Sequence, residues 1–194
     1  TTAGSNVKIG AENVHFEKSG AFTGEISADM LVELGVEYVV IGHSERRQYF
    51  GETDETVNKR TKAALAAGLK PIVCVGELLW ERECNITEEV IARQIKLDLY
   101  DVSAEDVKKT VIAYEPVWAI GMAGEVAAPD YVAARMVSIR KAIQTLFPGC
   151  MVPVLFGGSV NETNAQLYLE QSRADGLFIG RAAWDADRFY NIIT

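Results

Sequence analysis

The sequence has too few cysteines and histidines for the structures that these residues usually build. Its 194 residues include three cysteines, Cys74, Cys84 and Cys150, and two histidines, His15 and His43. An odd number of cysteines without a C-x-x-C spacing favours neither a disulfide framework nor a zinc site. Two histidines exclude a histidine-rich metal centre. We therefore expect neither a metal nor a cofactor.

Long hydrophobic runs and an excess of positive charge are also absent. No apolar run approaches the roughly 18 residues that a membrane span needs, and residues 1–10 lack the layout of a signal peptide. The net charge is −8 without a basic stripe, which argues against nucleic-acid binding. Hydrophobic residues make up 48% of the chain, enough for a sizeable core. We expect a cytoplasmic globular protein with no membrane or nucleic-acid partner.

Short, continuously apolar segments alternate with helical patterns along the chain. The predicted strands span residues 7–11, 38–42, 70–76, 111–115, 152–158 and 176–180. The predicted helices span residues 52–68, 87–101, 128–147, 161–171 and 185–193. Because the strands are apolar throughout rather than alternating, they indicate a buried parallel sheet with right-handed crossovers.

Two architectures fit this order, an open doubly wound sheet and a closed (β/α)8 barrel. No G-x-G-x-x-G follows any strand, which argues against a dinucleotide-binding sheet. Polar and glycine residues gather just after the strands, at His43–Glu45, Glu77, Glu115, Gly157–Ser159 and Gly180–Arg181. In a barrel these positions share the rim where active sites are built. Without any linker in the sequence, we predict a single domain over residues 1–194.

Glu115 is the first candidate functional residue. It ends the strand 111–115 and is followed by Pro116, Trp118 and Gly121. A carboxylate beside an apolar strand end is partly desolvated, which favours its protonated form and suits a general base. The alternative is an acid that caps a helix or forms an ion pair.

His43 directly follows the strand 38–42 and opens the motif "HSERR". At a helix N-terminus its ring would stay neutral and donate a hydrogen bond to an oxygen that gains charge. A structural histidine is the alternative. The neighbouring Arg46 and Arg47 either bind an anion or, as we favour, form structural ion pairs. The candidate acids are Glu25, Glu45 and Glu52.

The motif "FGGSV" predicts a phosphate cradle. Gly157 and Gly158 let backbone N–H groups point at a ligand, Ser159 adds a hydroxyl, and the following helix adds positive potential. Gly180 after the last strand repeats the pattern, as in barrels that bind phosphate after their final two strands. A plain tight turn is the alternative. Residues 119–129 are small and glycine-containing and predict a mobile lid, or else a connection without a role.

Five motifs together resemble the triosephosphate isomerase family. They are "SGAFTGEIS", "YVVIGHSERRQYFGETDETVNK", "CVGE", "VIAYEPVWAIG" and "GGSV", and the resemblance runs nearly end to end. It implies a (β/α)8 TIM barrel with six of its eight βα units present. It also implies a glycolytic and gluconeogenic isomerase that interconverts glyceraldehyde 3-phosphate and dihydroxyacetone phosphate through an enediolate, without a cofactor.

The resemblance also implies roles for individual residues. Glu115 would shuttle the proton between adjacent carbons, neutral His43 would stabilise the enediolate, and Glu45 would support the site. The lid would close over the substrate and exclude water. The substrate phosphate would lie against the turns that contain Gly121, Gly157, Gly158, Ser159, Gly180 and Arg181.

A homodimer is a further implication. The loop 13–25, which contains Phe22, would dock into a twin subunit, with Thr23 reaching towards the neighbour's site. Arg46 would pair with Glu25 or with a residue of the partner.

Four features depart from the family pattern. The chain starts at about the third strand, without the first two βα units and their catalytic lysine, so we expect a fragment that is inactive as it stands. The lid is one residue longer than usual. Phe156 stands where a tyrosine usually latches the lid. Arg181 replaces a glycine and either faces solvent or adds charge to the phosphate site.

Two other functions stay open at this point. The altered lid, Phe156 and Arg181 would suit a four-carbon substrate such as an erythrulose phosphate. A catalytically silent barrel that only binds a sugar phosphate is the second alternative, against which the presence of Glu115 and His43 argues.

Overall fold

The structure is a computed structural model that describes residues 4–121 and 124–194. It divides into two compact units. The first holds the chain up to Cys74 together with Leu97–Val111, and the second holds Val75–Lys96 and the chain from Ile112 onward. The single domain expected over residues 1–194 stays a prediction.

The first unit is built on three parallel strands. They are β1 (Gly10–Ala11), β2 (Tyr38–Ile41) and β3 (Lys70–Val75), which crosses into the second unit at its last residue. Gly10 is in register with Tyr38, and Tyr38 with Lys70. The helices of this unit are α1 (Ala28–Glu33), α2 (Ser44–Tyr49), α3 (Asp54–Ala66) and α6 (Ala104–Val107).

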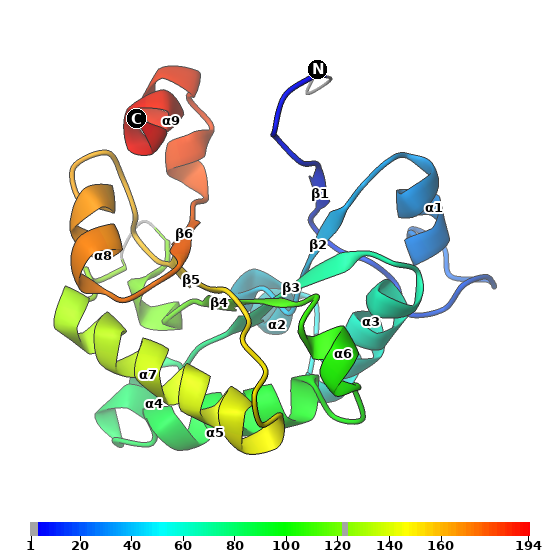
Figure 1. Ribbon diagram of the computed structural model, residues 1–194, viewed down its shortest axis with the longest axis horizontal. Coiled ribbons are helices and arrows are strands. Elements are labelled where there is room, and N and C mark those ends of the chain that lie inside the picture. The colour runs from blue at the N-terminus through cyan, green and yellow to red at the C-terminus, as the bar shows by residue number, and fades with distance from the viewer. Residues whose placement is uncertain (1–3, 122–123) are drawn as a thin grey trace. The chain divides into compact units, whose positions relative to one another are not determined.

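Helix α3 shows how the sequence sets its own helix ends. The Thr53 hydroxyl accepts the Thr56 N–H, and the Thr56 hydroxyl accepts the Thr53 N–H at 2.9 Å, so the first turn is capped reciprocally. Gly68 follows the helix with φ +86°, a conformation that glycine adopts readily just past a helix end. The helix buries Val57 and Ala64 and packs on β2 (Figure 1).

The second unit has the same parallel order. Its strands are β4 (Val111–Tyr114, of which Val111 belongs to the first unit), β5 (Val154–Gly157) and β6 (Gly176–Phe178). Ile112 is in register with Val154, and Gly157 with Phe178. The helices are α4 (Leu79–Glu83), most of α5 (Thr87–Asp98), α7 (Pro129–Leu146), α8 (Ala165–Gln171) and α9 (Ala186–Ile193), with the short 3-10 helices η1 (Val117–Ala119) and η2 (Arg181–Ala183).

Helix α7 provides much of the core of this unit. It starts at Pro129, which suits a first helical turn because proline has no N–H to leave unpaired. Its buried residues Val132, Met136, Ile139 and Ile143 recur at helical spacing. Helix α7 packs against β5 and α8 (Figure 1). Each such side chain contributes about 1.5–3 kcal/mol on burial.

The parallel strands and the five predicted helices are confirmed within a few residues at their ends. Beyond these, the described residues form the short helices α1, α2, α4 and α6 and the 3-10 helices η1 and η2. One helix start was wrong: α8 begins at Ala165 rather than at residue 161. The Asn164 side chain accepts the Asn161 N–H at 2.9 Å, and Asn161 accepts the Thr163 N–H at 2.9 Å. These side chains compete with helical hydrogen bonds and form a turn instead. No helix in the described ranges is long and apolar enough to cross a membrane.

Candidate active site

Glu115 lies directly after β4 and is only 4% exposed. Its N–H donates to the carbonyl of Val75 at 2.8 Å, which continues the strand pairing past the end of β4. Two glycines make room for it. A Cβ on Gly76 would lie 1.9 Å from the Glu115 carbonyl oxygen, and a Cβ on Gly157 would lie 3.1 Å from Glu115 Cγ. The carboxylate is therefore placed beside the glycine-rich turn after β5.

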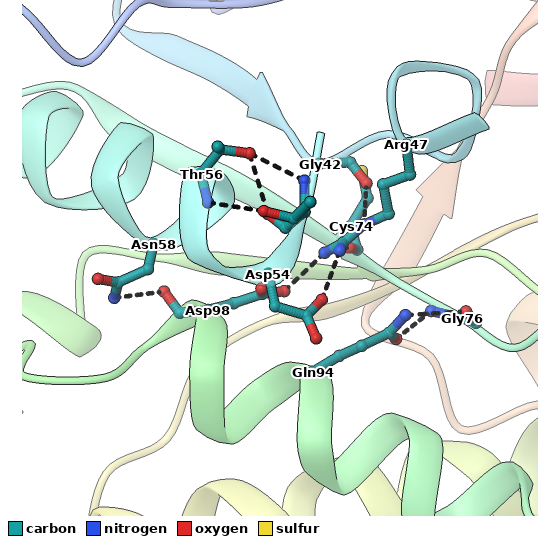
Figure 2. A network of polar contacts seen from close by, with 10 residues as sticks. Gly42, Arg47, Asp54, Thr56, Asn58, Cys74, Gly76, Gln94 and Asp98 are labelled. Atoms are coloured by element: carbon teal, nitrogen blue, oxygen red, sulfur yellow. Dashed lines mark hydrogen bonds and ion pairs between the residues drawn. The ribbon is translucent and has the colours of Figure 1, made fainter. Parts of the chain in front are cut away.

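The end of β3 is held by a side chain of α5. The Gly76 N–H donates to Gln94 Oε1 at 2.8 Å, and Gln94 Nε2 donates to the Gly76 carbonyl at 3.2 Å (Figure 2). Both backbone groups of Gly76 are thus satisfied. This fixes the backbone against which Glu115 packs.

A second buried acid, Glu77, organises the turn that follows Glu115. Its carboxylate is wholly buried and accepts hydrogen bonds from Tyr114 Oη, from Trp118 Nε1 at 2.7 Å and from Tyr131 Oη at 2.8 Å. Its carbonyl accepts the N–H of residue 117 at 3.0 Å. Burial and the nearby negative charge of Glu77 raise the pKa of Tyr114 well above its usual value.

Sequence reasoning placed Glu77 after a strand but gave it no role. Its three donors come from residues 37 to 54 positions further along the chain, so no local spacing pointed to them. The only signal was its place in "CVGE".

Strand β5 ends at Gly157, and Gly158 and Ser159 begin the turn that follows it. The Ser159 hydroxyl donates to the Ala119 carbonyl at 2.8 Å, so its proton is committed to the segment after β4. The Asn164 amide donates to the Ser159 carbonyl at 2.9 Å and fixes the turn. The predicted helix N-terminus is not adjacent, because α8 starts six residues after Ser159. Backbone N–H groups of the turn are thus the donors that this loop offers to an anion.

The turn after β6 leads into η2. The Ala183 N–H donates to the Gly180 carbonyl at 2.9 Å, which closes a tight turn. Arg181 is exposed, and its guanidinium pairs with no acid in the parts of the chain that the structure describes. It is a free cation one residue after a candidate phosphate-binding glycine.

The predicted lid, residues 119–129, is described at both flanks, whereas Met122 and Ala123 lie outside the described residues. Gly121 has φ +91°, a conformation that favours glycine. On the far flank, the buried Tyr168 hydroxyl donates to the Ala127 carbonyl at 2.7 Å. Phe156, which has no hydroxyl, is fully buried with its ring 4.5 Å from that of Tyr168. A tyrosine of α8 therefore anchors this flank.

His43 is the N-cap residue of α2, as the sequence predicted. Its Nδ1 accepts the Glu45 N–H at 3.3 Å. Since Nδ1 acts as an acceptor, the neutral ring carries its proton on Nε2. The Glu45 side chain itself is exposed.

The two arginines of "HSERR" form structural ion pairs, which confirms the interpretation favoured from sequence. Arg46 pairs with Glu52, one of the three candidate acids. Arg47 donates to Asp54 at 2.6 Å, to Asp98 at 2.8 Å and to the carbonyls of residues 42 and 74 (Figure 2). Burial favours a neutral guanidine, but Asp98 and Asp54 outweigh it and raise the pKa of Arg47.

The loop 13–25 is tied at its base and exposed at its tip. The His15 N–H donates to the Ile26 carbonyl at 2.8 Å, and the His15 ring lies 4.5 Å from that of Phe22. Phe22 and Thr23 are exposed. Glu25, the acid expected for Arg46, instead lies 3.5 Å from His15 Nδ1 and 3.9 Å from an arginine of α3. The expected pair of Arg46 with Glu25 was therefore wrong, because Glu52 takes that place.

Among the described residues, no group of three or more His, Cys, Asp or Glu side chains could hold a metal ion. The residues at the ends of the strands are instead two buried acids, Glu77 and Glu115, together with His43 and glycine-rich turns. Together with the parallel strand–helix order, they define an α/β enzyme of the (β/α)8-barrel class.

Comparison with known proteins identifies the family. A family model described as triosephosphate isomerase matches residues 1–194. The chain is 50% identical over 192 residues to a triosephosphate isomerase of Acetivibrio thermocellus, with 97% of this chain and 76% of that protein covered. A triosephosphate isomerase of Clostridium botulinum strain Loch Maree is 49% identical, with 98% of this chain and 77% of that protein covered. The chain belongs to the triosephosphate isomerase family.

Proposed function

We propose that the protein interconverts glyceraldehyde 3-phosphate and dihydroxyacetone phosphate through an enediolate. Its family consists of isomerases of aldose and ketose phosphates, and the similar proteins carry the name triosephosphate isomerase. The observation that carries the proposal is the buried Glu115, held beside the glycine-rich turn after β5.

Glu115 acts as the base. It removes a proton from the carbon next to the substrate carbonyl and returns it to the neighbouring carbon, so the same carboxylate serves both half-reactions. Its burial supports this role, because a carboxylate shielded from water keeps the transferred proton from exchanging with bulk solvent. The clearance at Gly76 and Gly157 sets its position to a fraction of an ångström.

His43 acts as the electrophile. Its Nδ1 accepts a backbone N–H, so Nε2–H is the donor that the ring offers to a substrate oxygen that gains negative charge. As the N-cap residue of α2, His43 keeps Nδ1 engaged as an acceptor, which orients Nε2 for this role. We assign Glu45 a supporting role next to it.

The substrate phosphate binds to backbone N–H groups of the turns after β4, β5 and β6. Neighbouring parallel strands β5 and β6 end at the same edge, which supports a shared anion site. The exposed Arg181 adds positive charge to it. The donor turns contain Gly121, Gly157, Gly158, Ser159 and Gly180.

The protein works in the cytoplasm as a glycolytic homodimer. The exposed tip of the loop 13–25, with Phe22 and Thr23, supports a subunit contact there. The family's place in glycolysis supports the location.

The test is isomerisation by the full-length protein and by Glu115→Asp. The shorter side chain retracts the carboxylate, so we expect kcat to fall about a hundredfold with a small change in KM. Incubation in deuterated water should place the label on carbon in the active protein and not in Glu115→Gln.

Two results would contradict the proposal. One is a full-length protein with no activity on three-carbon substrates. The other is Glu115→Gln with undiminished turnover. A higher kcat/KM on a four-carbon ketose phosphate than on dihydroxyacetone phosphate would move the substrate assignment but keep the chemistry.

A further inference from the structure

Arg82, on α4, contacts three residues of the segment that follows Glu115. Its guanidinium carbon lies 3.9 Å from the centre of the Trp118 ring and 5.5 Å from the centre of the Tyr131 ring. Its Nη1 donates to the Glu125 carboxylate at 3.0 Å. All of these residues belong to the second unit. The guanidinium of Arg82 thus joins three side chains from the 14-residue segment 118–131.

Arg82 lies over the ring face of Trp118, and Glu77 binds the polar edge of the same ring. The indole N–H donates to Glu77 at 2.7 Å, and the ring meets Tyr131 edge-on at 5.5 Å. Trp118 lies in η1, three residues after Glu115. Because only Pro116 and the residue at 117 separate Trp118 from Glu115, a displacement of Trp118 is passed on to the proposed base.

The contacts of Arg82 gain their strength from acting together. At 36% and 63% side-chain exposure, the ion pair between Arg82 and Glu125 would contribute little by itself. Stacking on Trp118 adds a cation–π contact at short distance and fixes the guanidinium plane. Because the stacking already restricts the rotamers of Arg82, forming the ion pair with Glu125 costs less side-chain entropy.

We propose that Arg82 is a positioning residue for the reaction, acting through Trp118 and Glu125 on the turn that carries Glu115. The inference rests on the proposed role of Glu115. Arg82 keeps the carboxylate in line with both carbons, so that protonation of the enediolate outpaces its breakdown. In that breakdown the C–O bond to phosphate breaks, its electron pair leaves with inorganic phosphate, and the remaining enol rearranges to a ketoaldehyde.

The kinetic test compares Arg82→Ala, Arg82→Lys and Glu125→Gln in the full-length protein. For Arg82→Ala we expect kcat to fall roughly five- to twentyfold while KM stays within about twofold, with more inorganic phosphate released per turnover. Arg82→Lys, which keeps the charge but not the planar stack, should be intermediate. Because the two residues act as a pair, the effect of Glu125→Gln should be smaller in the Arg82→Ala background.

Arg140→Ala is the matched control. It removes another ion pair of the second unit, with Asp175 at 2.8 Å and side-chain exposures of 29% and 48%. Its kcat and phosphate release should equal those of the unmodified protein. Equal values for Arg82→Ala and Arg140→Ala would overturn the proposal.

A second measurement does not depend on activity. The 194 residues contain Trp80, Trp118 and Trp184, so Trp80→Phe with Trp184→Phe, and with Phe at any tryptophan outside these residues, leaves Trp118 as the single reporter. Removing Arg82 uncovers the indole face, and acrylamide should then quench Trp118 about twice as strongly. Unchanged quenching would contradict the positioning role. If the unmodified protein has no isomerase activity, the proposed function fails, and quenching alone decides whether Arg82 fixes the turn.

Discussion

At the scale of single residues, two missing side chains decide where Glu115 lies. A Cβ on Gly76 would meet the Glu115 carbonyl carbon at 2.5 Å, which no backbone adjustment of a few tenths of an ångström relieves. A Cβ on Gly157 would meet Glu115 Cγ and Phe178 at 3.1 Å, which small shifts can relieve. Gly76 therefore sets the backbone, and Gly157 sets the side chain.

Gly157→Ala should shift the Glu115 carboxylate by a few tenths of an ångström without unfolding the protein. We expect kcat to fall roughly three- to tenfold, because proton transfer depends steeply on placement. Gly10→Ala is the control, since its Cβ would find only ordinary contacts from 3.5 Å. An unchanged kcat in Gly157→Ala would show that the base tolerates more displacement than this packing implies.

Tyr114 gives the protein a pH dependence at the alkaline end. Its pKa is raised well above 10.0 in the folded state, chiefly by burial and then by Glu77, whereas the unfolded chain keeps the ordinary value. The unfolded state therefore loses its proton first, so this contribution to stability is complete below about pH 10 and declines above it.

In Tyr114→Phe, unfolding free energy should decline less steeply above about pH 10 than in the unmodified protein. Urea denaturation at several alkaline pH values measures the slope. Tyr100→Phe, at a position that is 67% exposed, should keep the original slope. Equal slopes in both variants would argue against a buried, neutral Tyr114.

At the scale of elements, Arg47 ties the parts of the first unit together. Its guanidinium joins α2 to Asp54 at the start of α3, to the carbonyl of Cys74 in β3 and to Asp98 at the end of α5. Asp98 is wholly buried, so the ion pair with Arg47 compensates a charge in the interior. Arg47 therefore has a structural role, although it lies only four residues after the candidate catalytic residue His43.

Arg47→Ala should lower the unfolding free energy by about 3–5 kcal/mol, because it removes one partner of a buried ion pair. Chemical denaturation followed by circular dichroism measures the loss. Lys109→Ala breaks only the exposed pair with Asp106 and should leave the unfolding midpoint where it was. A similarly small effect of Arg47→Ala would mean that water reaches Asp98.

Elements that bury a continuous or periodic apolar face were predictable, and those without one were not. Such patterns predict helix α7 and the strands that contain Val39 and Ile112. The helices α1, α4 and α6 have six, five and four residues, too few to show a period. The position of Glu115 was also predictable, whereas the contacts of Glu77 and Arg82 were not, since they depend on tertiary packing.

At the scale of the whole molecule, the proposed dimer gives the exposed loop 13–25 its purpose. Phe22 is 43% exposed although its ring already packs on His15, which leaves its outer face for a second subunit. The same exposure on a lone subunit would leave an apolar tip in water.

Phe22→Asp should weaken self-association, because it buries a charge in the proposed contact. Sedimentation velocity should show the variant dissociating at concentrations where the unmodified protein stays dimeric. Tyr100→Asp places the same charge at another exposed aromatic position and should leave the dimer intact. A monomeric unmodified protein, or a dimeric Phe22→Asp, would contradict the proposed interface.

The hydrogen bond from Ser159 to the Ala119 carbonyl has a consequence for redesign. It makes the turns after β4 and β5 a matched set, since each supplies half of one contact. A graft that imports one turn from a homologue with different specificity would leave a polar atom stranded on the native turn. Swapping both as a cassette keeps the junction intact, so recombination of this enzyme should be planned with crossovers outside residues 115–164.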